Sequence, residues 1–455
     1  MKSWILLGLS ILMAVGCQKN RESVAEAEFE HRDTLNLPHY PYIDYDETFK
    51  GIKLDKSELN KKRSYVQDFY ENYWEYNQVS GGLLVAKNGK IIFEKYRGFA
   101  NFETEEALKT DTPIHISSIS KVLTALAVLK LVEEDRLKLD QLVSNFYSAF
   151  PYKNVTVRDL LNHRSGLPNY AYFEHDDKYW NTNNIQTNDN VLEALVQGIS
   201  KPYSSPNITF NYSNTNYALL ALIIEKVTGL TYPEAMKYIV FDPLKMDHTF
   251  VFNIKDSAKV SQSYTSRNKR WDFNFLDNIY GDKNIYSTPR DLFKMDKAMY
   301  AKKFLSEKLK KLMKQGYSYE KPGVKNYGLG IRLMEWDTGE KLWYHNGWWH
   351  GNYTTYVRGE NDSISIIALG NKQIRSVYTS FSLIGLLGDY PITMELEDRI
   401  VKQDTLKIAS DSLMPKLDKG VVSENLNLAS PTKSSSKKKN AQKDSAKVVS
   451  FSTNN

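Results

Sequence analysis

The spacing of hydrophobic and polar positions changes twice along this chain. From Gly81 to Tyr96, apolar and polar residues alternate, which is the period of a half-buried β-strand. In the middle of the chain, apolar residues recur with the three-to-four-residue spacing of helices. After Gly328, short runs rich in β-branched and aromatic residues again favour strands. The predicted strands are Leu83 to Lys87, Ile91 to Tyr96, Lys341 to His345, Tyr353 to Arg358 and Ser363 to Leu369.

Turn residues separate these predicted strands. Asn88-Gly89 favours a two-residue hairpin turn, because asparagine and glycine both tolerate a positive φ. The sequence Gly-Glu-Asn-Asp at Gly359 to Asp362 predicts a second turn between two of the later strands.

Capping residues mark the helices of the middle region. The stretch from Ser118 to Val132 is apolar nearly all round, which predicts a helix that is buried on every side. Four further helices are indicated by end signals. These signals are Thr156 with Asp159, the run from Asn214 to Gly229, Thr231 with Glu234, and Thr288-Pro289.

This order of elements predicts an α+β fold. One antiparallel sheet built from N- and C-terminal strands and flanked by helices, with an inserted and mainly helical subdomain, satisfies the order. We place the folded domain at residues 63–395, after a polar tether at residues 18–62. Residues 396–455 follow as a Lys/Ser-rich tail that we expect to be disordered.

The first 17 residues have the pattern of a secretory leader. Lys2 precedes an apolar run from Trp4 to Val15, which is too short to span a bilayer. Ala14-Val15-Gly16-Cys17 resembles a bacterial lipobox, which implies cleavage before Cys17 and lipid attachment to its thiol. The alternative is an ordinary signal peptide with an incidental cysteine. The lipobox reading predicts a lipid-anchored protein of the bacterial cell envelope.

Charge and composition add little to this picture. Hydrophobic residues make up 41% and charged residues 25% of the chain, as in ordinary soluble domains. The net charge is only +6, and much of the excess lies in the serine- and lysine-rich segment from Pro431 to Lys447. We therefore expect no nucleic-acid partner. The tail is either simply solvated or in contact with an anionic surface.

Three short motifs carry the candidate chemistry. Ser118 and Lys121 stand three residues apart at a helix start, so both side chains share one face, one turn apart. Such an ammonium can activate a base while the serine hydroxyl points into a cleft. Tyr212-Ser213-Asn214 precedes another helix, and His345-Asn346-Gly347 lies between two predicted strands. Each motif is common by chance, so their order and context carry the weight.

These residues resemble the serine β-lactamase-like hydrolases, in particular the branch of class C β-lactamases, DD-carboxypeptidases and related esterases. The resemblance covers roughly Gly81 to Leu387 and extends beyond the three motifs. It includes five blocks in the same order, one of which contains the Tyr212 motif. They are Thr156 to Pro168, Tyr212 to Tyr217, Leu222 to Gly229, Pro243 to Met246, and Ile285 to Leu292.

The resemblance implies a role for each motif residue. Ser118 is the nucleophile, and Lys121 with Tyr212 forms the base system that accepts the serine proton. Asn214 positions Lys121 and the substrate. The resemblance places His345 and Gly347 at the substrate and the backbone amides of Ser118 and Trp348 in the oxyanion hole. It implies neither a cofactor nor a metal, and the sequence contains no His-Glu-x-x-His motif.

Two departures from the family bear on the substrate. β-Lactamases usually carry Lys-Thr-Gly where this chain has His345-Asn346-Gly347, and a mostly uncharged imidazole binds a carboxylate less well. Asp282-Lys283-Asn284 stands where relatives often have small residues or glycine. The favoured hypothesis is therefore an esterase or D-amino-acid peptidase that acts on a small-molecule or peptide substrate. The alternatives are a β-lactamase proper and a catalytically silent lipoprotein, and the oligomeric state stays open.

Two aromatic segments bear on the shape of the cleft. Trp348 and Trp349 are adjacent to the expected oxyanion donor and are expected to wall the acyl pocket, and the alternative is that they are plain packing residues. The insert from Tyr170 to Phe210 is either a lid over the cleft or a surface loop with its own small cluster. His163 is expected to be structural and to support the turn at Ser165-Gly166.

Overall fold

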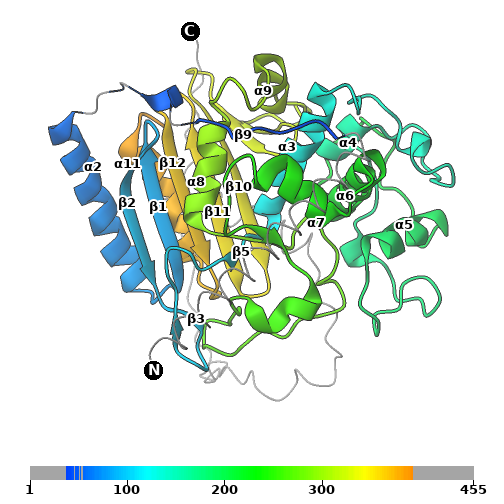
Figure 1. Ribbon diagram of the computed structural model, residues 1–455, viewed down its shortest axis with the longest axis horizontal. Coiled ribbons are helices and arrows are strands. Elements are labelled where there is room, and N and C mark those ends of the chain that lie inside the picture. The colour runs from blue at the N-terminus through cyan, green and yellow to red at the C-terminus, as the bar shows by residue number, and fades with distance from the viewer. Residues whose placement is uncertain (1–36, 46, 51, 53–54, 393–455) are drawn as a thin grey trace, which may run out of the picture. The chain divides into compact units, whose positions relative to one another are not determined.

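The computed structural model describes residues 37–45, 47–50, 52 and 55–392 (Figure 1). The chain divides into two units, residues 1–412 and 413–455, and every described residue belongs to the first. The predicted leader, Cys17 and the Lys/Ser-rich tail therefore lie outside the described residues. Within the described part, none of the helices has both the length and the apolar character needed to cross a membrane.

A seven-stranded antiparallel sheet forms the centre of the fold, in the order β2-β1-β12-β11-β10-β9-β8. The N-terminal hairpin pairs with the last strand, so that Leu84 lies opposite Ile367. This sheet and the helices described below confirm the predicted α+β class. The strands are β1 (Gly81–Lys87), β2 (Lys90–Arg97), β8 (Lys325–Tyr327), β9 (Arg332–Glu335), β10 (Lys341–Trp349), β11 (Asn352–Gly359) and β12 (Ile364–Gly370).

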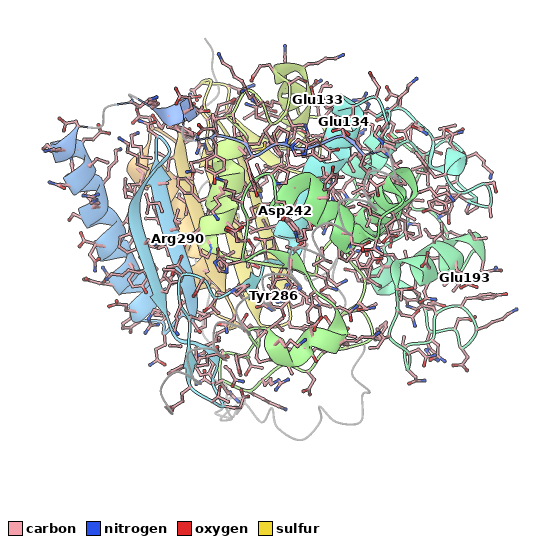
Figure 2. All side chains as sticks on the ribbon, in the orientation of Figure 1. Glu133, Glu134, Glu193, Asp242, Tyr286 and Arg290 are labelled. Atoms are coloured by element: carbon pink, nitrogen blue, oxygen red, sulfur yellow. The ribbon has the colours of Figure 1, made fainter. Side chains whose placement is uncertain are left out.

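Helices cover both faces of the sheet (Figure 1). One face carries a core of Trp74, Val85, Tyr344, Ile366 and neighbours, which terminal helices close. Those helices are α2 (Lys56–Phe69), which continues as a π-helical turn to Glu75, α10 (Ser376–Thr379) and α11 (Leu383–Leu387). On the other face α8 (Pro289–Ala298) packs against β1 and β12. Figure 2 labels Arg290 of α8, whose Nε donates to Glu94 Oε1 of β2 at 2.8 Å.

The inserted region is mainly helical. Its central helix, α3 (Ser120–Glu133), has eleven buried residues among its fourteen, because apolar residues lie on all of its sides. The short turn η3 (Ser117–Ile119) leads into it. Around α3 lie α4 (Val157–Leu161), α5 (Asn188–Val196), α6 (Asn214–Thr228), α7 (Tyr232–Met236) and α9 (Glu307–Met313).

Two small sheets join the helices to the main sheet. The strand β5 (Ile114–His115), which leads to Ser118, pairs with β7 (Ile285–Ser287), and β7 also pairs with β6 (Phe250–Val251). The pairing of β5 with β7 brings residues 281–284 beside the start of α3. The strands β3 (Phe99–Asn101) and β4 (Glu106–Ala107) form a separate pair.

The predicted strand end at His345 is wrong. The strand β10 continues to Trp349, because Asn346 and Gly347 pair with β11 although their residue types suggest a turn. The neighbour on the other side, β9, pairs only with the stretch from Lys341 to Tyr344. In the main sheet, β10 therefore has a partner on both sides as far as Tyr344 and on one side beyond it.

The packed part of the chain begins before the predicted end of the tether at residue 62. Ile43, Tyr45 and Phe49 are buried, and the amide of Ile43 donates to the carbonyl of Pro243 at 3.0 Å. The first helix begins at Lys56, with Asp55 as its N-cap. Few apolar residues, spaced without a regular period, make these contacts, which explains why the pattern alone indicated a polar tether.

Candidate active site

Ser118 and Lys121 face each other at the start of α3. Lys121 Nζ lies 3.2 Å from Ser118 Oγ and donates to the carbonyl oxygen of Asp282 at 2.8 Å. Lys121 is fully buried, and Ser118 is 8% exposed. The predicted serine–lysine pair is therefore assembled, with its ammonium withdrawn from water.

The turn that carries Ser118 has a strained backbone. Ser117 adopts a φ of 51°, in the left-handed region that residues with a side chain seldom occupy. Its amide donates to His115 Nδ1 at 3.1 Å, and His115 Nε2 lies 3.0 Å from Asn284 Oδ1. Since Nδ1 accepts, the proton belongs on Nε2, which donates to Asn284. Burial lowers the pKa of His115 to about 4, so the ring that holds this turn is neutral.

Gly347 is the point where this turn touches the sheet. A Cβ at Gly347 would lie 2.8 Å from the Ile116 carbonyl oxygen and 2.8 Å from Ser117 Cβ. The same Cβ would lie 2.3 Å from Thr354 Oγ1 on the neighbouring strand. Only glycine fits without displacing backbone, which gives this motif residue a steric role at the site.

Two cations lie near the ring of Tyr212, which is only 7% exposed. Lys121 Nζ is 5.0 Å from the ring centroid, and the guanidinium carbon of Arg332 is also 5.0 Å from it. Positive charge at such distances favours a phenolate over a neutral phenol. The surroundings of Tyr212 are therefore suited to a base that accepts the proton of Ser118.

His163 supports Tyr212 from the helical side. Its ring centroid is 4.3 Å from that of Tyr212. Its Nδ1 accepts from the Ser213 amide at 3.2 Å and from Asn216 Nδ2 at 3.0 Å. Burial and nearby Lys121 lower the pKa of His163 well below its usual range, so the ring is neutral. His163 thereby ties the turn after α4 to the start of α6, in line with the predicted structural role.

His345 is fully buried in β10. Its Nδ1 lies 2.7 Å from the Asn346 carbonyl oxygen, and its Nε2 lies 3.3 Å from the Tyr327 hydroxyl. Nδ1 therefore carries the proton, and Nε2 accepts from Tyr327. Burial and the charges of Arg332 and Lys121 lower the pKa of His345 well below its usual range. The imidazole is neutral and supplies no charge for a substrate anion.

Asn214 and the two tryptophans are placed differently from one another. Asn214 opens α6, and its buried Oδ1 has no hydrogen-bond partner among the described residues. Trp348 packs against the core on the face that carries α2 and α11. Trp349 points to the opposite face, where its Nε1 donates to Asp277 Oδ1 at 2.5 Å. The expectation that both side chains wall the acyl pocket is therefore wrong for Trp348, whose backbone amide remains the candidate oxyanion donor.

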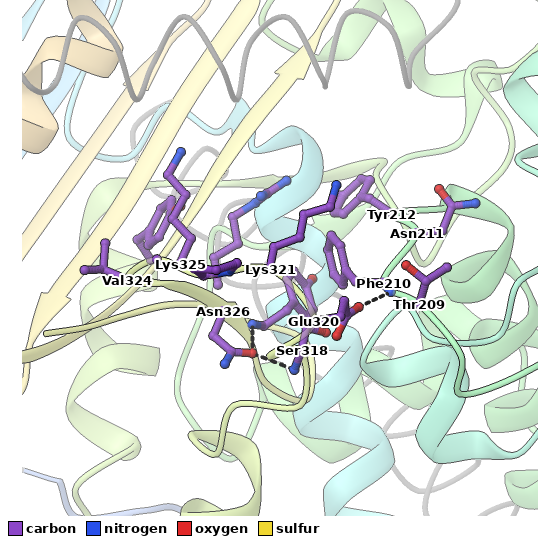
Figure 3. A pocket seen from close by; sticks show the side chains of 15 residues that line it. Thr209, Phe210, Asn211, Tyr212, Ser318, Glu320, Lys321, Val324, Lys325 and Asn326 are labelled. Carbon is purple, nitrogen blue, oxygen red and sulfur yellow. Dashed lines mark hydrogen bonds between the residues drawn. The ribbon is translucent and has the colours of Figure 1, made fainter. Parts of the chain in front are cut away.

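A cavity of about 570 Å³ lies beside Tyr212 (Figure 3). Arg332, Lys321 and Lys325 contribute positive charge to its wall. Glu320 also lines it, but its carboxylate accepts from the Phe210 amide at 2.6 Å and from Arg164 Nη1 at 3.0 Å. The basic residues of this wall, Arg332 above all, are functional candidates that sequence reasoning missed. The available signal was an arginine in an otherwise apolar run from Leu329 to Met334.

The insert from Tyr170 to Phe210 has the expected small cluster of its own and borders the cleft at one end. Phe173 and Trp180 are buried against each other, with ring centroids 5.2 Å apart, and α5 packs on α6. At the far end of the insert, Tyr203 and Phe210 border a second hollow next to Tyr212. The insert therefore has its own small cluster and also forms one edge of the cleft.

The comparison with known proteins decides the family. A profile of the Beta-lactamase family matches residues 66–378 of this chain. The chain belongs to the Beta-lactamase family. Penicillin-binding protein 4* of Bacillus subtilis is 31% identical over 335 residues, which cover 70% of this chain and 73% of that protein.

Two further relatives extend the comparison of this Beta-lactamase family member. Teichoic acid D-alanine hydrolase of Staphylococcus aureus is 27% identical over 334 residues, which cover 71% of this chain and 81% of that protein. The structure of an octameric penicillin-binding protein homologue from Pyrococcus abyssi superposes with a TM-score of 0.62 at 26% identity. That match covers 77% of this chain and 81% of the other. The protein is thus a serine hydrolase of the Beta-lactamase family, and the predicted resemblance is confirmed.

The site of this serine hydrolase is built from side chains and backbone amides. In the part of the chain that the structure describes, no three His, Cys, Asp or Glu side chains gather closely enough to hold a metal ion. Three sequence motifs meet at the junction of η3, α6 and β10. The geometry supports acyl transfer through Ser118.

Proposed function

We propose that this protein hydrolyses esters or amides of D-amino acids, D-alanyl groups in particular, through an acyl-enzyme on Ser118. The observation that carries the proposal is the 3.2 Å contact between Lys121 Nζ and Ser118 Oγ, with Tyr212 next to the same ammonium. Nucleophile and base system then lie at one point, as covalent catalysis requires.

The proposed steps follow from these positions. Tyr212, as phenolate, accepts the proton of Ser118 Oγ while Oγ bonds to the substrate carbonyl carbon. The backbone amides of Ser118 and Trp348 donate to the resulting oxyanion. The intermediate collapses, the bond to the leaving group breaks, and the leaving group takes the proton from Tyr212. Water, deprotonated by the same base, then cleaves the acyl-serine ester and frees Ser118.

The charge pattern supports a D-alanyl substrate over a β-lactam. His345 is neutral, so the position where β-lactamases usually carry a lysine offers no charge to an antibiotic carboxylate. Arg332 provides positive charge next to Tyr212, at the cavity wall. A relative that covers most of this chain is a teichoic acid D-alanine hydrolase. We therefore place the acyl group at Ser118 and the anionic part of the substrate toward Arg332.

Ester hydrolysis by a soluble form that begins after Cys17 tests the chemistry. Turnover of p-nitrophenyl butyrate and of a D-alanyl ester is expected for the wild type. The variant Ser118→Ala is expected to lose on the order of 10⁶-fold in kcat, as loss of a nucleophile does in serine proteases. Ser382→Ala, which removes a buried hydroxyl that bonds to Thr379, serves as the control and keeps its activity. Nitrocefin turnover as fast as ester turnover would favour a β-lactamase instead.

We also propose that the chain is a lipoprotein of the bacterial cell envelope, anchored through Cys17. The support is the leader with its lipobox-like Ala14-Val15-Gly16-Cys17 sequence. The full chain, produced in a bacterium, is expected to enter the detergent phase of Triton X-114. Cys17→Ser is expected to remain in the aqueous phase or to accumulate as the uncleaved precursor. If Cys17→Ser, after its leader is cleaved, enters the detergent phase to the same extent as the processed wild type, the proposed anchor is contradicted.

A further inference from the structure

Three charged or polar side chains are buried together directly behind Lys121. Asp282 is fully buried, Lys283 is 3% exposed, and Tyr170 is 1% exposed. Lys283 Nζ donates to the Tyr170 hydroxyl at 2.6 Å, and that hydroxyl donates to Asp282 Oδ2 at 2.8 Å. Lys283 Nζ and Asp282 Oδ2 are 3.7 Å apart. We call these three residues the buried triad.

Two members of the buried triad, Asp282 and Lys283, lie in the loop of residues 281–284, and the backbone of this loop contacts the catalytic Lys121. The carbonyl of Asp282 accepts from Lys121 Nζ at 2.8 Å, and the carbonyl of Gly281 accepts from Thr124 Oγ1 at 2.7 Å. Gly281 has a φ of 94°, and a Cβ there would lie 2.3 Å from the Tyr217 carbonyl oxygen. The loop is thus pressed against α3 and α6, and a shift of Asp282 would move the acceptor of Lys121.

Stability alone is a poor reason for this arrangement. Burying an aspartate and a lysine costs desolvation energy, and apolar replacement of such pairs is often neutral or stabilising. Asp282 Oδ1 is buried and has no hydrogen-bond partner among the described residues. Burial also lowers the pKa of Lys283, and the charge of Lys121 acts in the same direction. The triad and Lys121 therefore influence each other electrostatically.

We propose that Tyr170, Asp282 and Lys283 are positioning residues that hold the Asp282 carbonyl against Lys121 and set the pH range in which Lys121 stays an ammonium. This inference rests on the proposed serine chemistry. Asp282 favours the ammonium through its negative charge, and Lys283 opposes it. The charged and titratable groups around the triad and Lys121 are Asp277, His350, Arg332, Tyr212, Tyr217, Tyr232 and the neutral histidines His115, His163 and His345.

Labelling of Ser118 by a fluorophosphonate probe tests the inference, because it needs an activated serine but no knowledge of the substrate. The labelling rate is measured from pH 6 to pH 11. In the wild type, the rate falls at high pH when the ammonium loses its proton. In Lys283→Met, loss of a neighbouring positive charge is expected to move this fall upward by about one pH unit. In Asp282→Asn, loss of the negative charge is expected to move it downward by about one unit.

Further variants separate positioning from mere folding. The double variant D282N/K283M is expected to return the fall to within about half a unit of the wild type, because opposite changes of charge offset each other. Tyr170→Phe keeps the ring against Trp180 but loses both hydrogen bonds, and a slower rate is expected. The control uses a second buried ion pair, between Arg358 of β11 and Asp296 of α8, whose charged atoms are 2.5 Å apart. Asp296→Asn is expected to lower Tm without moving the pH profile.

Each result is decisive for one of the two proposals. Shifts of opposite sign in the two single variants support the triad's role. Profiles that keep the wild-type position while Tm falls would overturn it and leave a structural role only. If Ser118 of the wild type takes up no probe at any pH, the proposed function itself fails, together with the inference that rests on it.

Discussion

Thr354 Oγ1 donates a hydrogen bond to the carbonyl oxygen of Ile116 at 3.0 Å, across Gly347. Thr354 lies directly opposite Gly347 in the pairing of β10 with β11. The turn that carries Ser118 is therefore hydrogen-bonded to Thr354 of β11. The residue opposite Thr354 on β10 is Gly347, which has no side chain. This relationship fixes the distance between Ser118 and the strand that carries the second candidate oxyanion donor.

Gly347→Ala is expected to lower kcat by about 10²-fold, because a displacement of about 1 Å in a catalytic group has that effect. The added methyl group would meet Ile116 and Ser117, so the turn must move away from β10. Ester hydrolysis and a thermal melt measure the two consequences. Gly339→Ala is the control for activity: its φ of 101° strains the substituted backbone and lowers Tm, but a Cβ there has no neighbour within 4 Å and kcat is expected to stay unchanged. Equal activity in both variants would show that the close approach does not matter for catalysis.

Tyr212→Phe is expected to lower kcat by about 10²–10⁴-fold, the usual contribution of a general base. The ring and its contacts with His163 remain, so little change in Tm is expected. Tyr217→Phe is a matched control, since its hydroxyl donates to the Leu161 carbonyl at 2.7 Å within the same buried cluster. That variant is expected to lose about 1 kcal/mol of stability and to keep its activity. A fully active Tyr212→Phe would exclude Tyr212 as the base.

Arg332→Gln is expected to discriminate between substrates. For a D-alanyl compound with an anionic leaving group, kcat/KM is expected to fall about 10- to 100-fold, the worth of a charge-assisted hydrogen bond. For a neutral ester, the fall is expected to be much smaller. Lys308→Gln changes an exposed lysine on α9 and serves as the control. Equal losses of kcat/KM on both substrates would indicate that Arg332 acts on Tyr212 and not on the anionic part of the substrate.

Three buried neutral histidines predict an acid-sensitive fold. His115, His163 and His345 have pKa values below the unfolded value of about 6.5 because burial disfavours the imidazolium. Below that pH the unfolded chain binds more protons than the folded one, so stability falls as the pH drops. The full contribution is present above about pH 6.5, and for His115 the loss continues to about pH 4. Each histidine contributes about 1.4 kcal/mol per pH unit to the slope.

Urea unfolding between pH 8 and pH 4.5 measures this slope. His115→Gln, which retains an amide near Asn284, is expected to reduce it by about one histidine's share. His175→Ala alters a half-exposed histidine and serves as the control. A slope that is the same in all three proteins would show that His115 is not responsible for the acid sensitivity.

Local signals in the sequence predicted much of the fold. Asn88 and Gly89 do adopt positive φ values, 50° and 74°, in the hairpin between β1 and β2. Thr156 and Asp159 form the expected capping box at the start of α4. These features depend on residues that are close in the sequence, so the pattern alone reveals them. The pairing of Ser118 with Lys121 is local in the same sense.

Contacts between distant segments were not predictable in the same way. Tyr170 looks like an insert residue and Lys283 like a loop residue, and the pairing of β5 with β7 brings the loop of Lys283 to Lys121. Arg332 is an ordinary strand residue until β9 is placed beside Tyr212. The side chain of Trp348 was expected at the acyl pocket because it is adjacent to the expected oxyanion donor, whereas the continued ladder with β11 directs it to the core on the other face of the sheet.

The pairing of Leu84 in β1 with Ile367 in β12 also determines when the active fold can form during synthesis of the chain. A ribosome makes the chain from its N-terminus, so the first hairpin appears long before its partner strand. At that time Gly347 and Thr354 have not yet been synthesised, so the turn that carries Ser118 lacks its contacts with β10 and β11. The chain is thus inactive while its C-terminal strands are still missing, and activity arises only after β12 has been made and the sheet has closed.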